Sequence, residues 1–316
     1  MAVRRRCRIL PRDGPVRARA RYRYLFVHAH PDDETLWTGG TMAACAARPD
    51  ATVSLVTCTL GEQGDVLPAQ LALLAPGEAD QLGGYRAGEL ARACAVLGVT
   101  DHRSLGGAGR WRDSGMVPAG RGVRAAAPRE LHPRAFVAVN AVDEQVAALV
   151  AVLEELAPQV VVTYGADGGY GHPDHVRAHR VTVAALDRVA ARSPSPPRLL
   201  FTAIGRSTLD AAIARLAALP GLPFRLPGPD DLPSVPDATV TSRVDVRAHR
   251  WRRLAALRAH ATQIALWAPT PDVGGAGGGA AFALSNGVAQ PLLDTEEYVA
   301  ADGAPAPDPF TAAVPG

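Results

Sequence analysis

The chain has 316 residues, 47% of which are hydrophobic, and a formal net charge of only +2. A chain of this length can bury the core of one large α/β domain or of two smaller ones. The nearly balanced charge gives no electrostatic case for nucleic acid, an acidic membrane surface or a polyanionic substrate as a partner. No stretch is apolar for long enough to span a bilayer, so we expect no membrane partner.

Cysteine usage and the N-terminal residues bear on the compartment. The four cysteines are scattered without a Cys-x-x-Cys pair, which is typical of reduced thiols in a cytoplasmic protein. Residues 1–22 are rich in arginine but lack the apolar centre of a secretion signal. We expect a flexible N-terminal extension there and a cytoplasmic location. The sequence gives no indication of the oligomeric state.

From residue 23 the chain alternates strand-like and helix-like segments. Apolar runs rich in β-branched residues predict strands near 23–29, 51–58, 100–105, 159–164 and 199–204. Apolar residues at helical spacing predict helices near 38–48, 84–97, 141–157, 174–191 and 245–266. This order favours an α/β fold with a doubly wound, mostly parallel sheet and helices on both faces. We expect a single domain over 23–301 and a disordered tail over 302–316.

Two irregular segments are too long to be simple connections. They span 61–84 and 106–138, and irregular segments of this length are usually functional. The Gly-rich run at 272–281 is either a mobile flap or disordered, and the sequence favours neither. We therefore expect long active-site loops beside the sheet.

The first candidate motif follows the strand predicted at 23–29. It reads His30-Pro31-Asp32-Asp33-Glu34. A loop between the carboxyl end of a strand and a helix is where open α/β sheets hold their ligands. The two adjacent carboxylates diverge, so one can bind a metal while the other faces a water molecule. The structural alternative is that Asp32 or Asp33 only caps the helix that follows.

A second motif of the same kind follows the strand predicted at 159–164. It reads Tyr170-Gly171-His172-Pro173-Asp174-His175. Both loops can converge at one edge of one sheet. Two histidines and one carboxylate would then form a site for a divalent metal, with zinc expected and ferrous iron as the alternative. The candidate ligands are His30, Asp33 and His175.

The other polar residues of the two motifs suit proton transfer and charge stabilisation. A metal-bound water loses a proton near neutral pH, and Asp32 is the candidate general base. A carboxylate beside a histidine keeps the ring protonated, so His172, held by Asp174, can stabilise an oxyanion together with Tyr170. Asp174 can instead be only an acidic residue in the first turn of a helix.

These motifs resemble the signatures of the LmbE-like, or PIG-L, family of metal-dependent de-N-acetylases. The resemblance covers about residues 23–300 and includes stretches at 25–30, 56–62, 81–86, 106–116 and 259–263. It implies a Rossmann-like fold, one divalent metal ion, and hydrolysis of the acetamido group of a small amino sugar joined to inositol. The alternative is a related activity, that of mycothiol S-conjugate amidase, which cleaves a larger amide at the same kind of metal centre.

Residue by residue, the resemblance implies the same roles as the motif chemistry. It places the metal on His30, Asp33 and His175 and makes Asp32 the general base. His172, oriented by Asp174, would be a charged stabiliser or a general acid, and Tyr170 would help to polarise the amide carbonyl. The residues that would bind the substrate are Asp65, Arg86, Asp113 and Met116. Asp65 stands where the family usually has glutamate, which shortens its reach to the sugar.

Two other classes of protein are less consistent with these residues. Non-haem iron oxygenases also use two histidines and a carboxylate, but they do not need the additional Asp32 and His172. A sugar-binding protein without activity would not need every proposed catalytic residue. Both alternatives therefore rank below a hydrolase.

Overall fold

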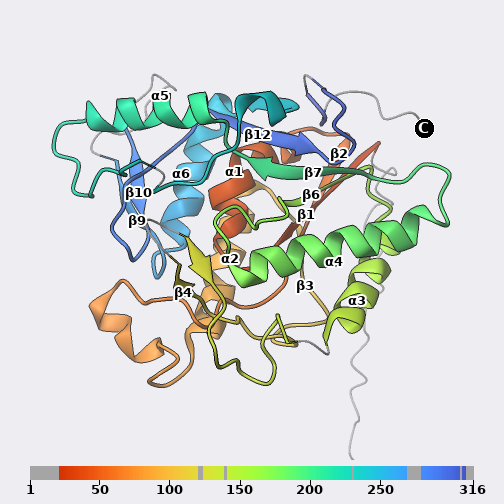
Figure 1. Cartoon of the computed structure of the whole chain (residues 1–316), viewed down its shortest axis with the longest axis horizontal. Coiled ribbons are helices and arrows are strands. Elements are labelled where there is room, and N and C mark those ends of the chain that lie inside the picture. The colour runs from red at the N-terminus through yellow and green to blue at the C-terminus, as the bar shows by residue number, and fades with distance from the viewer. Residues whose placement is uncertain are drawn as a thin grey trace, which may run out of the picture.

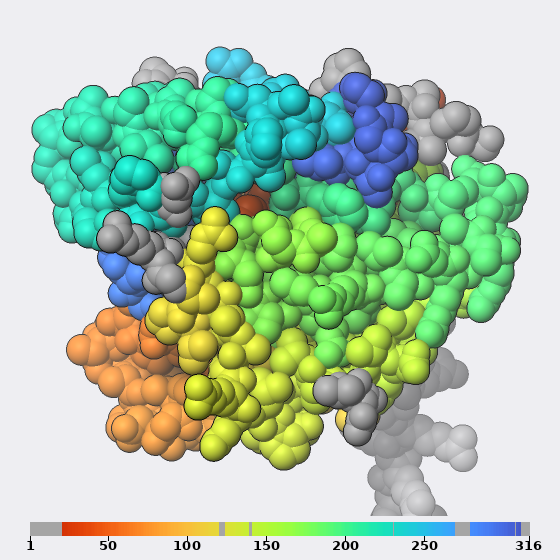
Figure 2. Space-filling model, in the orientation of Figure 1, coloured from red at the N-terminus to blue at the C-terminus, as the bar shows by residue number. Residues whose placement is uncertain are grey.

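The computed structural model describes residues 21–119, 124–138, 141–229, 231–268, 279–306 and 308–310. Within them, a central seven-stranded sheet is flanked by helices (Figure 1). In the same orientation, Figure 2 shows a hollow between the yellow, green and teal parts of the chain. Residues 1–20 of the predicted N-terminal extension and residues 272–278 of the Gly-rich run lie outside the described residues.

The central sheet is doubly wound. Its strands, in spatial order, are β3 (Asp101–Ser104), β2 (Ala51–Thr57), β1 (Tyr22–His28), β6 (Val160–Tyr164), β7 (Arg198–Ala203), β12 (Thr295–Ala300) and β8 (Ser242–Asp245). The first five are parallel, and β12 and β8 add an antiparallel edge. The chain moves outward from β1 to β3 and then returns to β6 on the other side of β1, so the switch point lies between β1 and β6. The predicted fold class is confirmed.

Helices cover both faces of the sheet (Figure 1). One group packs together from α1 (Asp33–Ala46), α2 (Leu82–Leu97) and α6 (Arg250–Ala259). The other group is α3 (Val142–Leu156) and α4 (Pro173–Ala190). A further helix, α5 (Arg206–Ala217), follows β7. It was not predicted.

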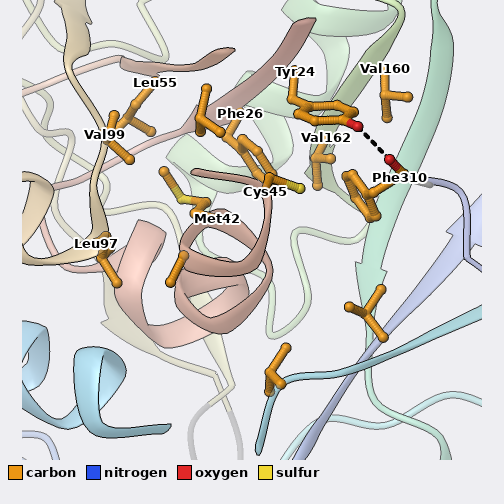
Figure 3. Close-up of a cluster of buried hydrophobic side chains, with 14 of the residues drawn as sticks. Tyr24, Phe26, Met42, Cys45, Leu55, Leu97, Val99, Val160, Val162 and Phe310 are labelled. Carbon is orange, nitrogen blue, oxygen red and sulfur yellow. Dashed lines mark hydrogen bonds between the residues drawn. The ribbon is translucent and has the colours of Figure 1, made fainter. Parts of the chain in front are cut away.

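Alternation along β1 explains why there are two cores. Tyr24 and Phe26 belong to the apolar cluster that includes Met42 of α1 (Figure 3). Leu25 and Val27 belong to the cluster that includes residues of α3 and α4. Successive side chains of a strand point to opposite faces, and these four are at most 2% exposed. A strand whose two faces are both buried belongs to the interior of a sheet that carries helices on each of its faces.

The helix predicted at 245–266 is much shorter in the structure. The chain forms β8 up to Asp245, a short 3-10 turn, and then α6 over Arg250–Ala259. Tertiary contacts end the helix, because the backbone N–H of Thr262 binds the carboxylate of Glu89 at 2.9 Å. Ile264 still packs with Leu254 of α6 in one apolar cluster, which is why its spacing suggested one continuous helix.

Within the tail predicted to be disordered at 302–316, residues 302–305 are exposed, whereas Ala306, Pro309 and Phe310 are buried. Phe310 is 3% exposed, and its ring contacts the rings of Tyr24, Phe26 and Tyr298. Its carbonyl oxygen accepts a hydrogen bond from the Tyr24 hydroxyl (Figure 3). It accepts another from Arg48. These contacts hold Phe310 against the sheet.

Two small sheets lie outside the central one. β9 (Ala265–Trp267), β10 (Ala281–Ala283) and β11 (Gln290–Pro291) form an antiparallel sheet, and β4 (Val117–Pro118) pairs with β5 (Ala125–Ala126). Of the helices in the described ranges, none has the length and apolarity needed to cross a membrane. The cytoplasmic location stays a prediction.

Candidate metal and catalytic site

The two sequence motifs meet at the switch point of the sheet. β1 and β6 are neighbouring parallel strands, so the loops that follow them leave the same edge. The first loop ends where α1 begins at Asp33, and the second ends where α4 begins at Pro173. As a result, the ring centroids of His30 and His175 lie 5.3 Å apart.

The three predicted ligands lie around one carboxylate oxygen. Oδ2 of Asp33 is 3.2 Å from Nδ1 of His30 and 3.2 Å from Nε2 of His175. In a tetrahedral zinc site with bonds of about 2.0 Å, neighbouring ligand atoms lie about 3.3 Å apart. The two distances to Asp33 match this value. Two sets of potential ligand atoms lie within 4.8 Å of one another, namely His30 with His172 and His175, and His30 with Asp113 and Asp174; neither set includes Asp33.

Contacts on the far side of each ring leave the inner nitrogen available to a metal. Nδ1 of His175 is 3.1 Å from the carbonyl oxygen of Gly168, and Nε2 of His30 is 3.1 Å from Oδ2 of Asp174. Because these oxygens only accept, the nitrogens that face them carry the proton in a neutral ring. Nε2 of His175 is buried without a hydrogen-bond partner among the described residues. The donor set therefore fits a divalent metal ion.

Asp174 contacts the candidate ligand His30 instead of the ring of His172. Its Oδ2 also accepts the backbone N–H of Ser114 at 3.0 Å. Only its backbone N–H meets His172, by donating to Nδ1 at 3.1 Å. This differs from the expected pairing of the Asp174 carboxylate with the His172 ring. The physical reason is that His172 caps α4 with its own Nδ1, and the carboxylate turns towards the loop after β1.

Carboxylates surround His30. Burial lowers its pKa, but Asp113, Asp174 and Asp33 outweigh burial and hold the pKa well above its usual value. Burial raises the pKa of Asp33, yet His175 and His30 bring it well below its usual value. The site is therefore built to hold positive charge among carboxylates.

Asp32, the predicted general base, is buried beside an arginine. Its Oδ2 is 3.1 Å from Nη2 of Arg86. Burial raises the pKa of Asp32 to about 6, with Arg86 opposing the rise and Asp33 adding to it. A carboxylate with this pKa can accept a proton efficiently near neutral pH. Its side chain makes no capping hydrogen bond to α1, which weighs against a role as helix cap alone.

His172 and Tyr170 complete the cluster. The His172 ring lies 4.6 Å from that of His30, and the Tyr170 ring 5.1 Å from that of His175. Burial, together with His30 and His175, lowers the pKa of His172 well below its usual value. Since Nδ1 accepts a hydrogen bond, a neutral His172 carries its proton on Nε2 and acts as a donor. The resemblance implies a charged stabiliser or a general acid at His172, and a neutral ring differs from the first of these roles.

A pocket of about 480 Å³ opens beside Asp33, one of the candidate ligands. Its lining includes four of the predicted site residues, namely Asp33, Asp65, Met116 and Tyr170. The hollow in Figure 2 lies here, with a small red area of the N-terminal part of the chain at its floor. The volume falls in the usual range for small-molecule sites.

The four predicted substrate contacts fall into two pairs. Asp65 and Met116 are exposed and line the pocket. Asp113 is buried, and its carboxylate accepts two backbone N–H groups of the surrounding loops. Arg86 is 3% exposed and donates to two backbone carbonyl oxygens. Asp113 and Arg86 are therefore bound to the protein's own loops.

Two buried residues beside the site were not foreseen as a pair. Glu34 and His260 form an ion pair at 2.7 Å, and both are 0% exposed. Glu34 stands in the first motif, and His260 lies in one of the stretches that resemble the family. No local sequence pattern links the two residues, because they lie 226 residues apart in the chain. The pocket residue Arg124, which lies far from both motifs in the sequence, was missed for the same reason.

Two imidazoles and a carboxylate, with a further carboxylate beside them and a pocket that reaches Asp33, are the arrangement of a metal-dependent hydrolase. The model of one protein family, described as PIG-L: GlcNAc-PI de-N-acetylase, matches residues 25–186. The chain belongs to this family.

Relatives with known names match most of the chain. The 1D-myo-inositol 2-acetamido-2-deoxy-alpha-D-glucopyranoside deacetylase 1 of Saccharopolyspora erythraea is 55% identical, over 89% of this chain and 90% of the relative. A deacetylase of the same name from Actinosynnema mirum is 54% identical, over 89% of this chain and 92% of the relative. Another from Rhodococcus erythropolis is 47% identical, over 89% of this chain and 91% of the relative.

Proposed function

We propose that the chain hydrolyses the acetamide of 1D-myo-inositol 2-acetamido-2-deoxy-α-D-glucopyranoside, giving glucosaminyl-inositol and acetate, a step of mycothiol biosynthesis. The main support is that relatives up to 55% identical, over 89% of the chain, are named as deacetylases of this compound. The cluster of candidate ligands and a buried carboxylate at the floor of a pocket is consistent with that chemistry.

We propose zinc as the metal, with ferrous iron as the alternative. Nδ1 of His30, Oδ2 of Asp33 and Nε2 of His175 would hold the ion. A divalent ion bound there lowers the pKa of a water molecule to about 7 and polarises a carbonyl group. Both effects favour attack on an amide.

Asp32 moves the proton in this proposal. With a pKa of about 6, its carboxylate can take the proton that the attacking water loses as the oxygen bonds to the amide carbon. The carbon–nitrogen bond then breaks, and the same proton passes from Asp32 to the departing nitrogen. The products are an acetate and an amine.

His172 and Tyr170 stabilise the carbonyl oxygen. Negative charge grows on this oxygen as the tetrahedral intermediate forms, and fixed donors placed there lower the barrier. Nε2–H of a neutral His172 is one donor. The Tyr170 hydroxyl is the other, and burial keeps it protonated by raising the pKa of Tyr170 above its usual value.

The substrate would lie against Asp65 and Met116. Asp65 is exposed at the pocket, and its carboxylate can accept hydrogen bonds from sugar hydroxyls. Met116 is 52% exposed and offers apolar surface to a ring face. A pocket of about 480 Å³ has room for a sugar joined to inositol.

The decisive experiment is amine release by the purified chain after removal of metal and reloading with zinc or ferrous iron. The acetylated glucosaminyl-inositol is compared with a mycothiol S-conjugate at equal concentrations. Metal-dependent release that favours the smaller substrate supports the proposal. Preference for the conjugate would replace it with the amidase activity, and no release from either substrate would contradict both.

A further inference from the structure

Asp32 has a backbone conformation that its surroundings must maintain. Its φ is 119° and its ψ is −32°, a region that residues other than glycine rarely adopt. Such conformations persist where neighbouring groups hold them, and they concentrate in functional loops. Here the backbone conformation also determines where the Asp32 carboxylate points.

Glu34 holds the backbone N–H of Asp32. Oε2 of Glu34 accepts this N–H at 2.9 Å. Oε1 lies 2.7 Å from Nε2 of His260 and 2.5 Å from the hydroxyl oxygen of Thr35. Both Glu34 and His260 are 0% exposed. A carboxylate with both oxygens engaged and no access to water is held in one position, and so is the N–H that it binds.

His260 connects the loop to a different part of the fold. It directly follows α6 as the C-cap residue, and α6 packs against both α1 and α2. Arg86 of α2 lies 3.1 Å from the Asp32 carboxylate on the other side. The backbone of Asp32 is therefore held through α6, and its side chain through α2.

We propose that Glu34 and His260 are a positioning pair, which holds Asp32 in its left-handed backbone conformation and so directs its carboxylate at the attacking water. This inference rests on the proposed function, in which Asp32 accepts the proton. Buried ion pairs add little net stability because both charges lose their hydration. Neither residue lines the pocket. The pair therefore acts through the orientation of Asp32.

Substitutions of His260 test the pair. His260→Ala should lower kcat about 100-fold, as a displaced catalytic group does, with KM and metal affinity unchanged. His260→Gln should recover most of this loss, because its amide can donate to Glu34 in place of Nε2. Leu257→Ala is the matched control, since Leu257 is also 0% exposed on α6. It should lower stability and leave kcat of the folded protein unchanged.

A second measurement does not depend on the reaction. Exchange of the Asp32 amide proton with deuterium should be slow in the unmodified chain and in Leu257→Ala, and fast in His260→Ala. If the unmodified chain does not release amine, the proposed function fails, and the exchange result alone decides on the pair. Equal exchange in His260→Ala and the unmodified chain overturns the proposal. So does a kcat of His260→Ala that matches the Leu257→Ala control, or a loss of metal affinity.

Discussion

Oδ2 of Asp174 lies 3.1 Å from Nε2 of His30, while Nδ1 of the same ring lies 3.2 Å from Oδ2 of Asp33. The first contact holds the ring in place and favours the proton on Nε2 when the ring is neutral. Nδ1 is then the nitrogen left to bind a metal. This carboxylate–histidine pairing is a common support of metal ligands, and it ties the loop after β1 to the first turn of α4.

We therefore expect Asp174→Asn to weaken metal binding about 10–100-fold. Asparagine keeps the shape of the side chain but is a poorer acceptor for the Nε2 proton. Competition with a fluorescent chelator at equilibrium measures the affinity. Asp187→Asn, an exposed position on the same helix, is the control. An affinity equal to that of this control would show that the His30 ring does not depend on Asp174.

Asp32→Asn should leave metal binding intact and nearly abolish turnover. The amide cannot accept a proton, and loss of a general base lowers kcat about 10²–10⁴-fold. Steady-state kinetics and metal analysis of the same preparation give both quantities. His175→Ala is the comparison, because it should lose metal affinity. If Asp32→Asn also lost its metal, the roles of Asp32 and Asp33 would be exchanged.

The resemblance and the structure indicate different roles for Arg86. As a sugar-binding residue, its loss would raise KM. In the structure it donates to the carbonyl oxygens of Gly61 and Pro31 and pairs with Asp32. A single ammonium group cannot replace this fork of donors. We therefore expect Arg86→Lys to lower kcat more than it raises KM, and the reverse pattern in steady-state kinetics would restore the sugar-binding role.

The sequence alone predicted the part of the site that depends on the order of strands, loops and helices along the chain. A strand, a polar loop and a helix occur twice, and a doubly wound sheet places the ends of both strands at one edge. The approach of His30, Asp33 and His175 follows from that topology. All five strands that the sequence predicted are present in the central sheet.

Contacts that depend on side-chain direction were not predictable in the same way. His172 and Asp174 are close in sequence, which suggested that their side chains pair. At a helix start, however, the N-cap side chain binds a backbone N–H within the first turn. His172 does so here, and the Asp174 carboxylate meets His30, which lies 144 residues away in the chain. The pair of Glu34 and His260 likewise depends on where α6 ends.

The C-terminal segment is predicted to be disordered because its composition, rich in proline and alanine, is typical of disorder. One residue changes the outcome, since Phe310 fills a site in the core formed with Tyr24, Phe26 and Tyr298. Those contacts lie near the start of β1, whereas the candidate metal site follows its end. Stability and catalysis should therefore respond separately to a change at Phe310.

Phe310→Ala should lower the free energy of unfolding by about 3–5 kcal/mol, the usual loss when a buried phenylalanine is truncated. Urea denaturation followed by fluorescence measures this difference. The control is Leu73→Ala, because Leu73 is 72% exposed and its truncation should change stability by less than about 0.5 kcal/mol. Below the unfolding transition, metal affinity and kcat should match those of the unmodified chain in both variants. A loss in Phe310→Ala no larger than in the control would mean that the C-terminal segment is not part of the core.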